Sequence, residues 1–182
     1  ASYRYNGLGE RTIKILASGN TVLFTYNGAG QLLHESEYDN TGAMIQQRSY
    51  VWLGDMPVAY AQTETETAFV YLHRDHLNSP RVATNQAGAI VWRWRSDAFG
   101  YQGIEYLGGT TYKIGLRFPG QYFDEESGRY YNYFRDYDPG LGRYVQSEPI
   151  GLKGGLNSYG YVYQNPMHWI EPSGHFVGVA VR

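Results

Sequence analysis

The densest group of residues that could do chemistry is the run His73-Arg74-Asp75-His76. If this run is a strand, His73 and Asp75 point to one face and His76 to the other, which suits a metal ion poorly. The chain has no cysteine, no Ser/His/Asp order and no Gly-rich phosphate loop. The run therefore indicates a structural motif, and we predict no metal and no cofactor. The histidines without a partner at ligand spacing are His34, His168 and His175.

A second candidate surface lies at Trp92 and Trp94, which alternate with Arg93 and Arg95. Planar rings beside guanidinium groups can stack on a sugar or a cation. A strand shows the same alternation when one of its faces packs against a neighbouring layer. Both interpretations stay open at the level of the residues, and the pattern favours packing.

The elements that must position these residues are predicted to be β-strands joined by tight turns. The chain has 23 Gly and 19 Tyr, and aromatic residues make up 16% of it. Aromatic side chains fit pleated, half-buried surfaces and Gly supplies turns, so this mixture favours strands over helices. No segment predicts a helix longer than about two turns.

An aromatic residue, an Asn or Asp and a Gly recur at a similar spacing. The clearest copies are Tyr26-Asn27-Gly28-Ala29-Gly30 and Tyr38-Asp39-Asn40-Thr41-Gly42, with a variant at 5–9 and a weaker copy at 84–88. Asn or Asp can hydrogen-bond its own backbone, and Gly takes the left-handed conformation that other residues avoid. The repeat predicts β-hairpins in series.

The repeats fade near residue 100. Residues 62–67 predict a polar hairpin tip and residues 107–111 a loop. Beyond them the spacing is irregular, although Tyr159, Tyr161 and Tyr163 alternate as on one face of a strand. We divide the chain into hairpins at 1–100, an irregular Gly/Tyr/Pro-rich segment at 101–175 and a short tail at 176–182. The first residues resemble the middle of a strand, so we expect a fragment of a longer protein.

The charge balance argues against several classes of partner. Lys and Arg number 15 and Asp and Glu 17, for a formal net charge of -2. This balance offers no electrostatic argument for binding nucleic acid or an anionic membrane. The absence of cysteine excludes a disulfide scaffold and a thiolate metal site. No apolar run approaches the roughly 18 residues of a membrane span.

Three stretches of the chain resemble a known family. They lie at residues 71–81, 117–139 and 142–166, and the second begins Arg117-Phe118-Pro119-Gly120-Gln121. With the repeats, they are similar to Rhs, or YD-repeat, proteins and to the Rhs repeat-associated core segment of bacterial polymorphic toxins. The C component of Tc toxins is similar in the same way. The resemblance covers nearly the whole chain.

The resemblance implies an all-β fold in which YD-repeat hairpins form part of a spiral β-shell and segment 101–175 forms a plug. It implies that the shell encloses a C-terminal toxin, with the tail 176–182 as the start of a variable tip. The implied partners are this toxin domain and the upstream YD repeats, with secretion-system and immunity proteins as further candidates. The implied location is the bacterial cytoplasm at synthesis, followed by secretion or delivery to target cells. Closing hairpins into a shell also removes exposed strand edges.

The resemblance further implies a self-cleavage site like that of an aspartic protease, at Arg135, Glu148 and Glu171. The bond it implies is His175–Phe176. In this chemistry two carboxyl groups share a proton, so one polarises the carbonyl and the other activates water, while the arginine tunes the pair. The family usually has Asp at both acidic positions and Leu at position 175. This chain departs from that pattern at all three positions.

Three interpretations of this segment stay open. It is an active self-cleaving peptidase, an orphan core fragment with a vestigial site, or a YD-repeat adhesion module without chemistry. Glu-Pro before Gly is ordinary in loops, and Arg135 can pair with its neighbours Asp136 or Asp138. Glu also carries one methylene more than Asp, which moves the carboxylate by more than the ~0.5 Å that a preorganised site tolerates. The separation of the Glu148 and Glu171 carboxyl groups distinguishes these interpretations.

Overall fold

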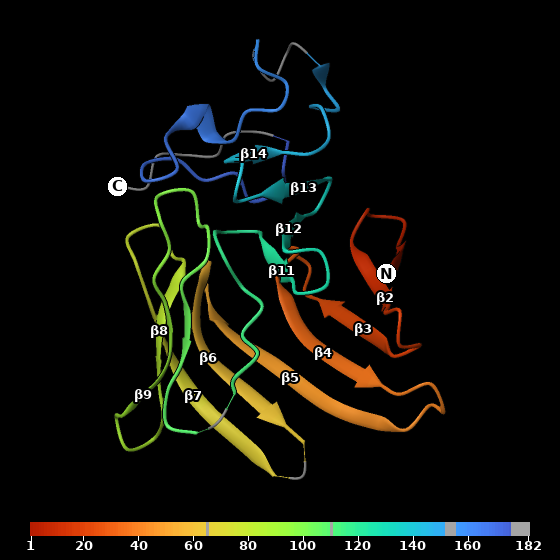
Figure 1. The fold of residues 1–182 in the computed structure, drawn as a ribbon, viewed down its shortest axis with the longest axis vertical. Coiled ribbons are helices and arrows are strands. Elements are labelled where there is room, and N and C mark those ends of the chain that lie inside the picture. Colours follow the sequence, from red (N-terminus) through yellow and green to blue (C-terminus); the bar gives the residue numbers. More distant parts are fainter. Residues whose placement is uncertain (65, 110, 152–155, 176–182) are drawn as a thin grey trace.

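A computed structural model describes residues 1–64, 66–109, 111–151 and 156–175, which form antiparallel strands in two sheets (Figure 1). The large sheet has ten strands in sequence order: β1 (Ser2–Tyr5), β2 (Arg11–Ile15), β3 (Thr21–Tyr26), β4 (Leu32–Tyr38), β5 (Met44–Leu53), β6 (Met56–Thr63), β7 (Thr67–Arg74), β8 (Pro80–Thr84), β9 (Ile90–Trp94) and β10 (Ile104–Tyr106). The small sheet has β11 (Tyr122–Asp124), β12 (Arg129–Asn132), β13 (Arg135–Asp138) and β14 (Arg143–Tyr144), and a short turn, η2 (Val162–Gln164), follows it. The all-β prediction is confirmed. Within the described ranges, no helix has the length and apolar character needed to cross a membrane.

The turn chemistry that the repeats predicted builds most of the hairpins of the large sheet. At Asn27 the side-chain oxygen accepts hydrogen bonds from the backbone N–H groups of Ala29 and Gln31, at 2.9 and 3.0 Å. Gly30 then takes a φ of +76°, which a residue with a Cβ adopts only with strain. Turns with the same two side-chain bonds occur at Asn6, Asp39, Asp75, Asn85 and Asp97.

The run His73-Arg74-Asp75-His76 contains one of these turns. Asp75 makes the turn, and its second oxygen accepts a hydrogen bond from Arg81 Nε at 2.7 Å. The left-handed position, held by Gly in the other turns, is taken here by Asn78 with a φ of +67°, and this substitution hides the repeat in the sequence. His73 and His76 contact unrelated partners. Among the residues that the structure describes, no three His, Asp or Glu lie close enough to hold a metal ion.

One face of the large sheet is buried beneath the chain that follows β10. The extended segment around residues 111–115 crosses this face (Figure 1), and the buried side chains of Tyr50 and Gln62 bond it. The Gly115 N–H donates a hydrogen bond to the Tyr50 hydroxyl at 3.0 Å, and Gln62 Nε2 donates to the Thr111 carbonyl at 3.1 Å. These bonds lead the chain along the sheet to β11.

Trp92 and Trp94 belong to this core. They are 0% and 2% exposed, and the Trp94 ring meets the Phe118 ring edge to face, with centroids 5.4 Å apart. The packing interpretation of these residues is therefore confirmed, because buried rings cannot form a stacking surface for a sugar.

A buried carboxylate attaches the small sheet to the large one. Glu35 on β4 accepts hydrogen bonds from Arg48 at 2.8 Å and from the Tyr50 hydroxyl at 2.7 Å. Its third donor is the hydroxyl of Tyr122, on β11 of the small sheet, at 2.6 Å. Because the Glu35 carboxylate is buried and needs hydrogen-bond donors, the Tyr122 side chain is held in the orientation that brings its hydroxyl to Glu35.

In a second buried cluster the carboxylate belongs to the small sheet and its cationic partners belong to the large sheet. Asp124 on β11 lies 2.6 Å from Arg11 Nη1 and 3.0 Å from Lys14 Nζ, both on β2. The two clusters hold β11 at Tyr122 and Asp124, two positions apart, so the small sheet has one orientation on the large sheet.

Two sequence expectations need comment. The alternation of Tyr159, Tyr161 and Tyr163 predicted a strand, and this prediction is wrong. The chain forms η2 there, since three successive residues from Val162 take positive φ, which no strand accommodates. The division at residue 100 stays a prediction, and the last strand of the large sheet, β10, lies just beyond it. The tail 176–182 lies outside the described residues.

Candidate active site

Arg135 opens β13 after a tight hairpin in which two residues separate it from its partner Asn132. Alternation along β13 turns Arg135 into the core, where 2% of it is exposed. Asp136 and Asp138 lie on the opposite face, and Asp136 accepts a hydrogen bond from Gln146. The suggested pairing of Arg135 with either aspartate is therefore not what the structure shows.

The Arg135 side chain instead holds both acids that the sequence singled out. Its Nη2 atom lies 2.7 Å from Glu148 Oε2, and the same atom donates a hydrogen bond to Glu171 Oε1. Glu148 and Glu171 are 8% and 2% exposed. Because the two carboxyl groups share one nitrogen atom, they lie side by side in the core.

The loops that carry the two acids are fixed by separate hydrogen bonds. The Glu148 N–H donates to the Ser158 carbonyl at 2.7 Å. The Glu171 carbonyl accepts a hydrogen bond from Asn132 Nδ2 at 2.9 Å. A proline follows each acid and disfavours further regular structure, because it lacks an N–H and restricts the residue before it.

Burial raises the pKa of Glu171 from 4.5 to about 7. Desolvation is the largest cause, the Arg135 guanidinium opposes it, and the neighbouring Glu148 carboxylate raises the pKa further. Hydrogen bonds from the Tyr144 hydroxyl and the Val162 N–H favour the ionised form without offsetting the burial. Glu171 therefore keeps its proton across the mildly acidic range.

The N–H group that reaches Glu171 comes from a strained turn. Val162, Tyr163 and Gln164 have φ values of 44°, 54° and 61°. Each left-handed residue with a Cβ costs roughly 1–2 kcal/mol, and such residues normally occur singly. The Gln164 N–H closes the turn on the Tyr161 carbonyl at 2.8 Å. Strain of this kind persists where the surrounding structure requires it, and here it directs a backbone donor at a buried carboxylate.

The Tyr144 ring packs against the guanidinium group of Arg135. Its ring centroid lies 3.6 Å from Arg135 Cζ, and its hydroxyl accepts a hydrogen bond from Asn132 Nδ2 at 2.6 Å. A guanidinium over an aromatic face is stabilised by the ring quadrupole, more strongly when both are desolvated. Burial raises the pKa of Tyr144 well above its usual value, so the hydroxyl stays protonated.

The chain after Glu171 passes through a turn that requires Gly. Gly174 has a φ of +67°, and a Cβ at this position would lie 2.4 Å from the Asn132 carbonyl oxygen. The Gly174 carbonyl accepts a hydrogen bond from Arg135 Nε at 2.5 Å. One arginine thus holds the two acids and also the backbone that leads to position 175.

His175 lies directly against the acidic pair. Its Nδ1 is 3.2 Å from Glu148 Oε1, and its ring centroid is 3.8 Å from that of Phe134. The structure therefore brings together four of the five residues that the sequence singled out. The fifth, Phe176, lies outside the described residues.

Sequence reasoning missed the residues that support this site. They are contributed by the small sheet and by the loop before His175, and they are Asn132, Phe134, Tyr144 and Gly174. The first three fall within the stretches that carry the family resemblance, and Gly174 closes the second Glu-Pro motif. Their roles depend on contacts such as that of Asn132 with Glu171, 39 positions away, which no local pattern reports.

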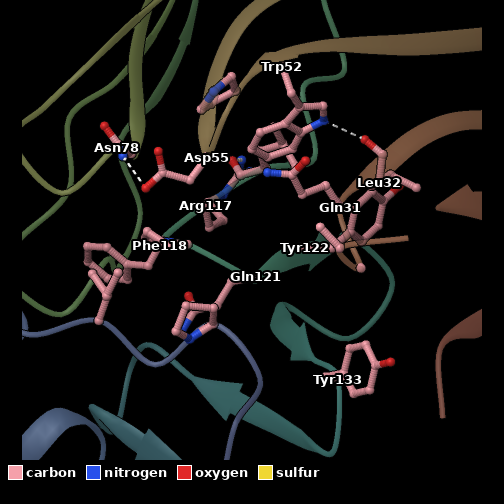
Figure 2. A pocket seen from close by; sticks show the side chains of 18 of the residues that line it. Gln31, Leu32, Trp52, Asp55, Asn78, Arg117, Phe118, Gln121, Tyr122 and Tyr133 are labelled. Carbon is pink, nitrogen blue, oxygen red and sulfur yellow. Dashed lines mark hydrogen bonds between the residues drawn. The ribbon is translucent and has the colours of Figure 1, made fainter. Parts of the chain in front are cut away.

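A cavity of about 320 Å³ lies between the large sheet and the loop that carries Glu171 (Figure 2). Its lining is mostly apolar and includes Trp52 and Phe118, with Ile170 and Pro172 on the side of the loop. At Gly120 a Cβ would lie 1.9 Å from the Pro172 carbonyl oxygen, so this contact admits only Gly. The acids of the site do not line the cavity.

Comparison with known proteins identifies the relatives of this chain, although no protein-family model matches it. "Probable deoxyribonuclease RhsA" of Dickeya dadantii is 34% identical over 177 residues, which are 94% of this chain and 12% of that protein. "Double-stranded DNA deaminase toxin A" of Burkholderia cenocepacia is 40% identical over 106 residues, which are 57% of this chain and 7% of that protein. The chain is a segment of an Rhs/YD-repeat protein.

The fold of this Rhs segment matches a solved structure. It superposes on a chain in the crystal structure of TcdB2–TccC3 with a TM-score of 0.73 and 24% sequence identity, over 94% of the segment and 9% of that chain. At this identity the likeness establishes the fold alone. The segment spans between 7% and 12% of the length of these three proteins.

Proposed function

We propose that this Rhs segment is the closing end of a toxin-enclosing shell and that it cuts its own chain between His175 and Phe176. The observation that carries the proposal is the pair of buried carboxyl groups, Glu148 and Glu171, on one nitrogen of Arg135. The shell is supported by the TccC3-like fold and by relatives whose names describe toxins. The partner is a C-terminal toxin, made with the shell in the bacterial cytoplasm and delivered to target cells.

The roles of the two acids follow from their surroundings. Glu171 holds its proton because burial raises its pKa to about 7, and it acts as the acid. Glu148 accepts hydrogen bonds from Arg135 and His175, and it acts as the base. Two carboxyl groups with opposite roles are the arrangement that hydrolysis of an amide requires.

The reaction takes two steps. In the first, Glu148 removes a proton from a water molecule, the water oxygen bonds to the His175 carbonyl carbon, and Glu171 gives its proton to the carbonyl oxygen. In the second, the carbon–nitrogen bond breaks as the nitrogen of Phe176 takes the proton from Glu148. A hydroxyl of the intermediate returns a proton to Glu171, which leaves a carboxylic acid at His175 and an amine at Phe176.

A plug or an adhesion module without chemistry would not need this arrangement. A buried guanidinium with a buried carboxylate carries a desolvation cost of several kcal/mol per ion, and the second carboxyl group is buried beside them, all of which apolar residues would avoid. Strain in η2 and the Gly requirement at Gly174 add to that cost. Costs of this kind concentrate at functional sites.

The test is to express the chain with a tag at each end and follow its mass with time. We expect a single cut that leaves His175 at the end of the N-terminal product. Glu148→Gln or Glu171→Gln should abolish the cut, because each removes one proton-transfer group while preserving size. Glu125→Gln is the matched control, since that side chain is 79% exposed and outside the site.

An intact wild-type chain across the range from about pH 5 to pH 8 would leave the segment as a plug with a vestigial site. A cut that persists in both glutamine variants would show that another group or a contaminating protease does the chemistry. Neither result would affect the fold.

A further inference from the structure

Two neighbours contact the side chain of His175, although only the backbone carbonyl of His175 takes part in the proposed cut. The Phe134 ring lies against it with an interplanar angle of 34° and centroids 3.8 Å apart. Its Nδ1 atom lies 3.2 Å from Glu148 Oε1. The chain just before it is anchored by the Gly174 carbonyl, which accepts a hydrogen bond from Arg135 Nε. The imidazole is therefore held by one ring contact and one carboxylate contact.

This contact distinguishes the two acids from each other. Both carboxyl groups share Arg135 Nη2, so the arginine alone does not decide which of them acts as the base. Glu148 receives a second donor from His175 on its other oxygen, whereas Glu171 is bonded by Tyr144 and the Val162 N–H. An ionised carboxylate only accepts hydrogen bonds, so the His175 nitrogen that faces it carries a hydrogen.

We infer that His175 is a positioning residue for Glu148, so that the residue whose carbonyl is attacked also orients the base that activates the water. The inference rests on the proposed self-cleavage and specifies how this chain recognises its own cut site. A leucine at this position would offer no donor to Glu148. Position 175 therefore favours a planar side chain that stacks on Phe134 and donates a hydrogen bond from the place of Nδ1.

The first experiment compares single-turnover cleavage rates of chains that differ at position 175. His175→Leu should cut at least about tenfold more slowly, the effect of losing one hydrogen bond to a charged group. His175→Asn places its amide nitrogen close to the position of Nδ1, and it should recover a large part of the rate. His73→Leu is the control, because His73 is exposed on β7 and bonds Thr84. Equal rates for the wild type and His175→Leu, or a lack of recovery in His175→Asn, would overturn the inference.

The second experiment does not depend on cleavage. In the Glu171→Gln chain, which we expect to stay intact, nitrogen NMR of the five histidines reports which ring nitrogen of His175 carries hydrogen. We expect a hydrogen on Nδ1, and we expect this signal to move when Glu148→Gln is added. A His175 with a bare Nδ1, or one indifferent to Glu148→Gln, would refute the contact even if the chain cuts itself. An uncut wild type with the expected signal would refute the proposed function and leave the contact established.

Discussion

The sharpest consequence of the site is a pH-dependent stability that comes from one residue. Glu171 has a pKa near 4.5 when exposed and about 7 in the folded chain. Each unit of difference corresponds to about 1.4 kcal/mol, so the ionisation of Glu171 should cost the folded state about 3 kcal/mol. Replacing Glu171 with Gln removes this cost, because the amide has no proton to lose.

The sign follows from proton binding. Between about pH 4.5 and pH 7 the folded chain keeps the proton of Glu171 while the unfolded chain has released it. The free energy of unfolding contributed by this residue is therefore complete below pH 4.5 and is lost as the pH rises through 7. A carboxylate governed by its ion pair with Arg135 would behave in the opposite way and lose stability on acidification.

The assay is urea unfolding of the wild type and Glu171→Gln at several values between about pH 4.5 and pH 8, on material shown by mass to be intact. We expect the wild type to lose about 3 kcal/mol relative to the variant over that range. All other titrating groups occur in both chains, so the difference isolates Glu171. A flat difference, or one that grows in favour of the wild type with rising pH, would refute a protonated Glu171 and its role as the acid.

Two further predictions test the framework around the site. Gly174→Ala should destabilise the chain by about 1–3 kcal/mol and slow the cut, since a Cβ would lie 2.4 Å from the Asn132 carbonyl oxygen. Gly128→Ala, at a φ of +69° but with no atom within 4 Å of its Cβ, should cost only about 1 kcal/mol and leave the cut unchanged, and equal effects would contradict this reasoning. Glu35→Gln should cost about 1.5–3 kcal/mol in urea unfolding, because it removes the buried charge that Arg48 and two tyrosine hydroxyls bond and leaves Arg48 with Glu37 as its carboxylate partner. A loss below about 1 kcal/mol would show that this cluster does not hold the sheets together.

The turns of the large sheet were predictable because they are local. Asn27 bonds the N–H groups two and four positions ahead, and Gly30 supplies the positive φ, so all participants lie within five residues. The same logic failed at Asp75, where Asn78 replaces the Gly and the repeat becomes invisible. It failed again near Tyr161, where alternating tyrosines suggested a strand. There the chain adopts a strained turn that no local preference favours.

From the sequence we could predict the repeated hairpins, most of their turns and, through resemblance to Rhs proteins, the three residues Arg135, Glu148 and Glu171. The sequence left open whether these residues meet, because the separation of two carboxyl groups depends on how two separate loops pack against Arg135. The tertiary structure decided that point by placing both acids on one nitrogen of Arg135. It also raised the pKa of Glu171. Desolvation depends on burial, and burial arises only when distant segments cover Glu171 and raise its pKa.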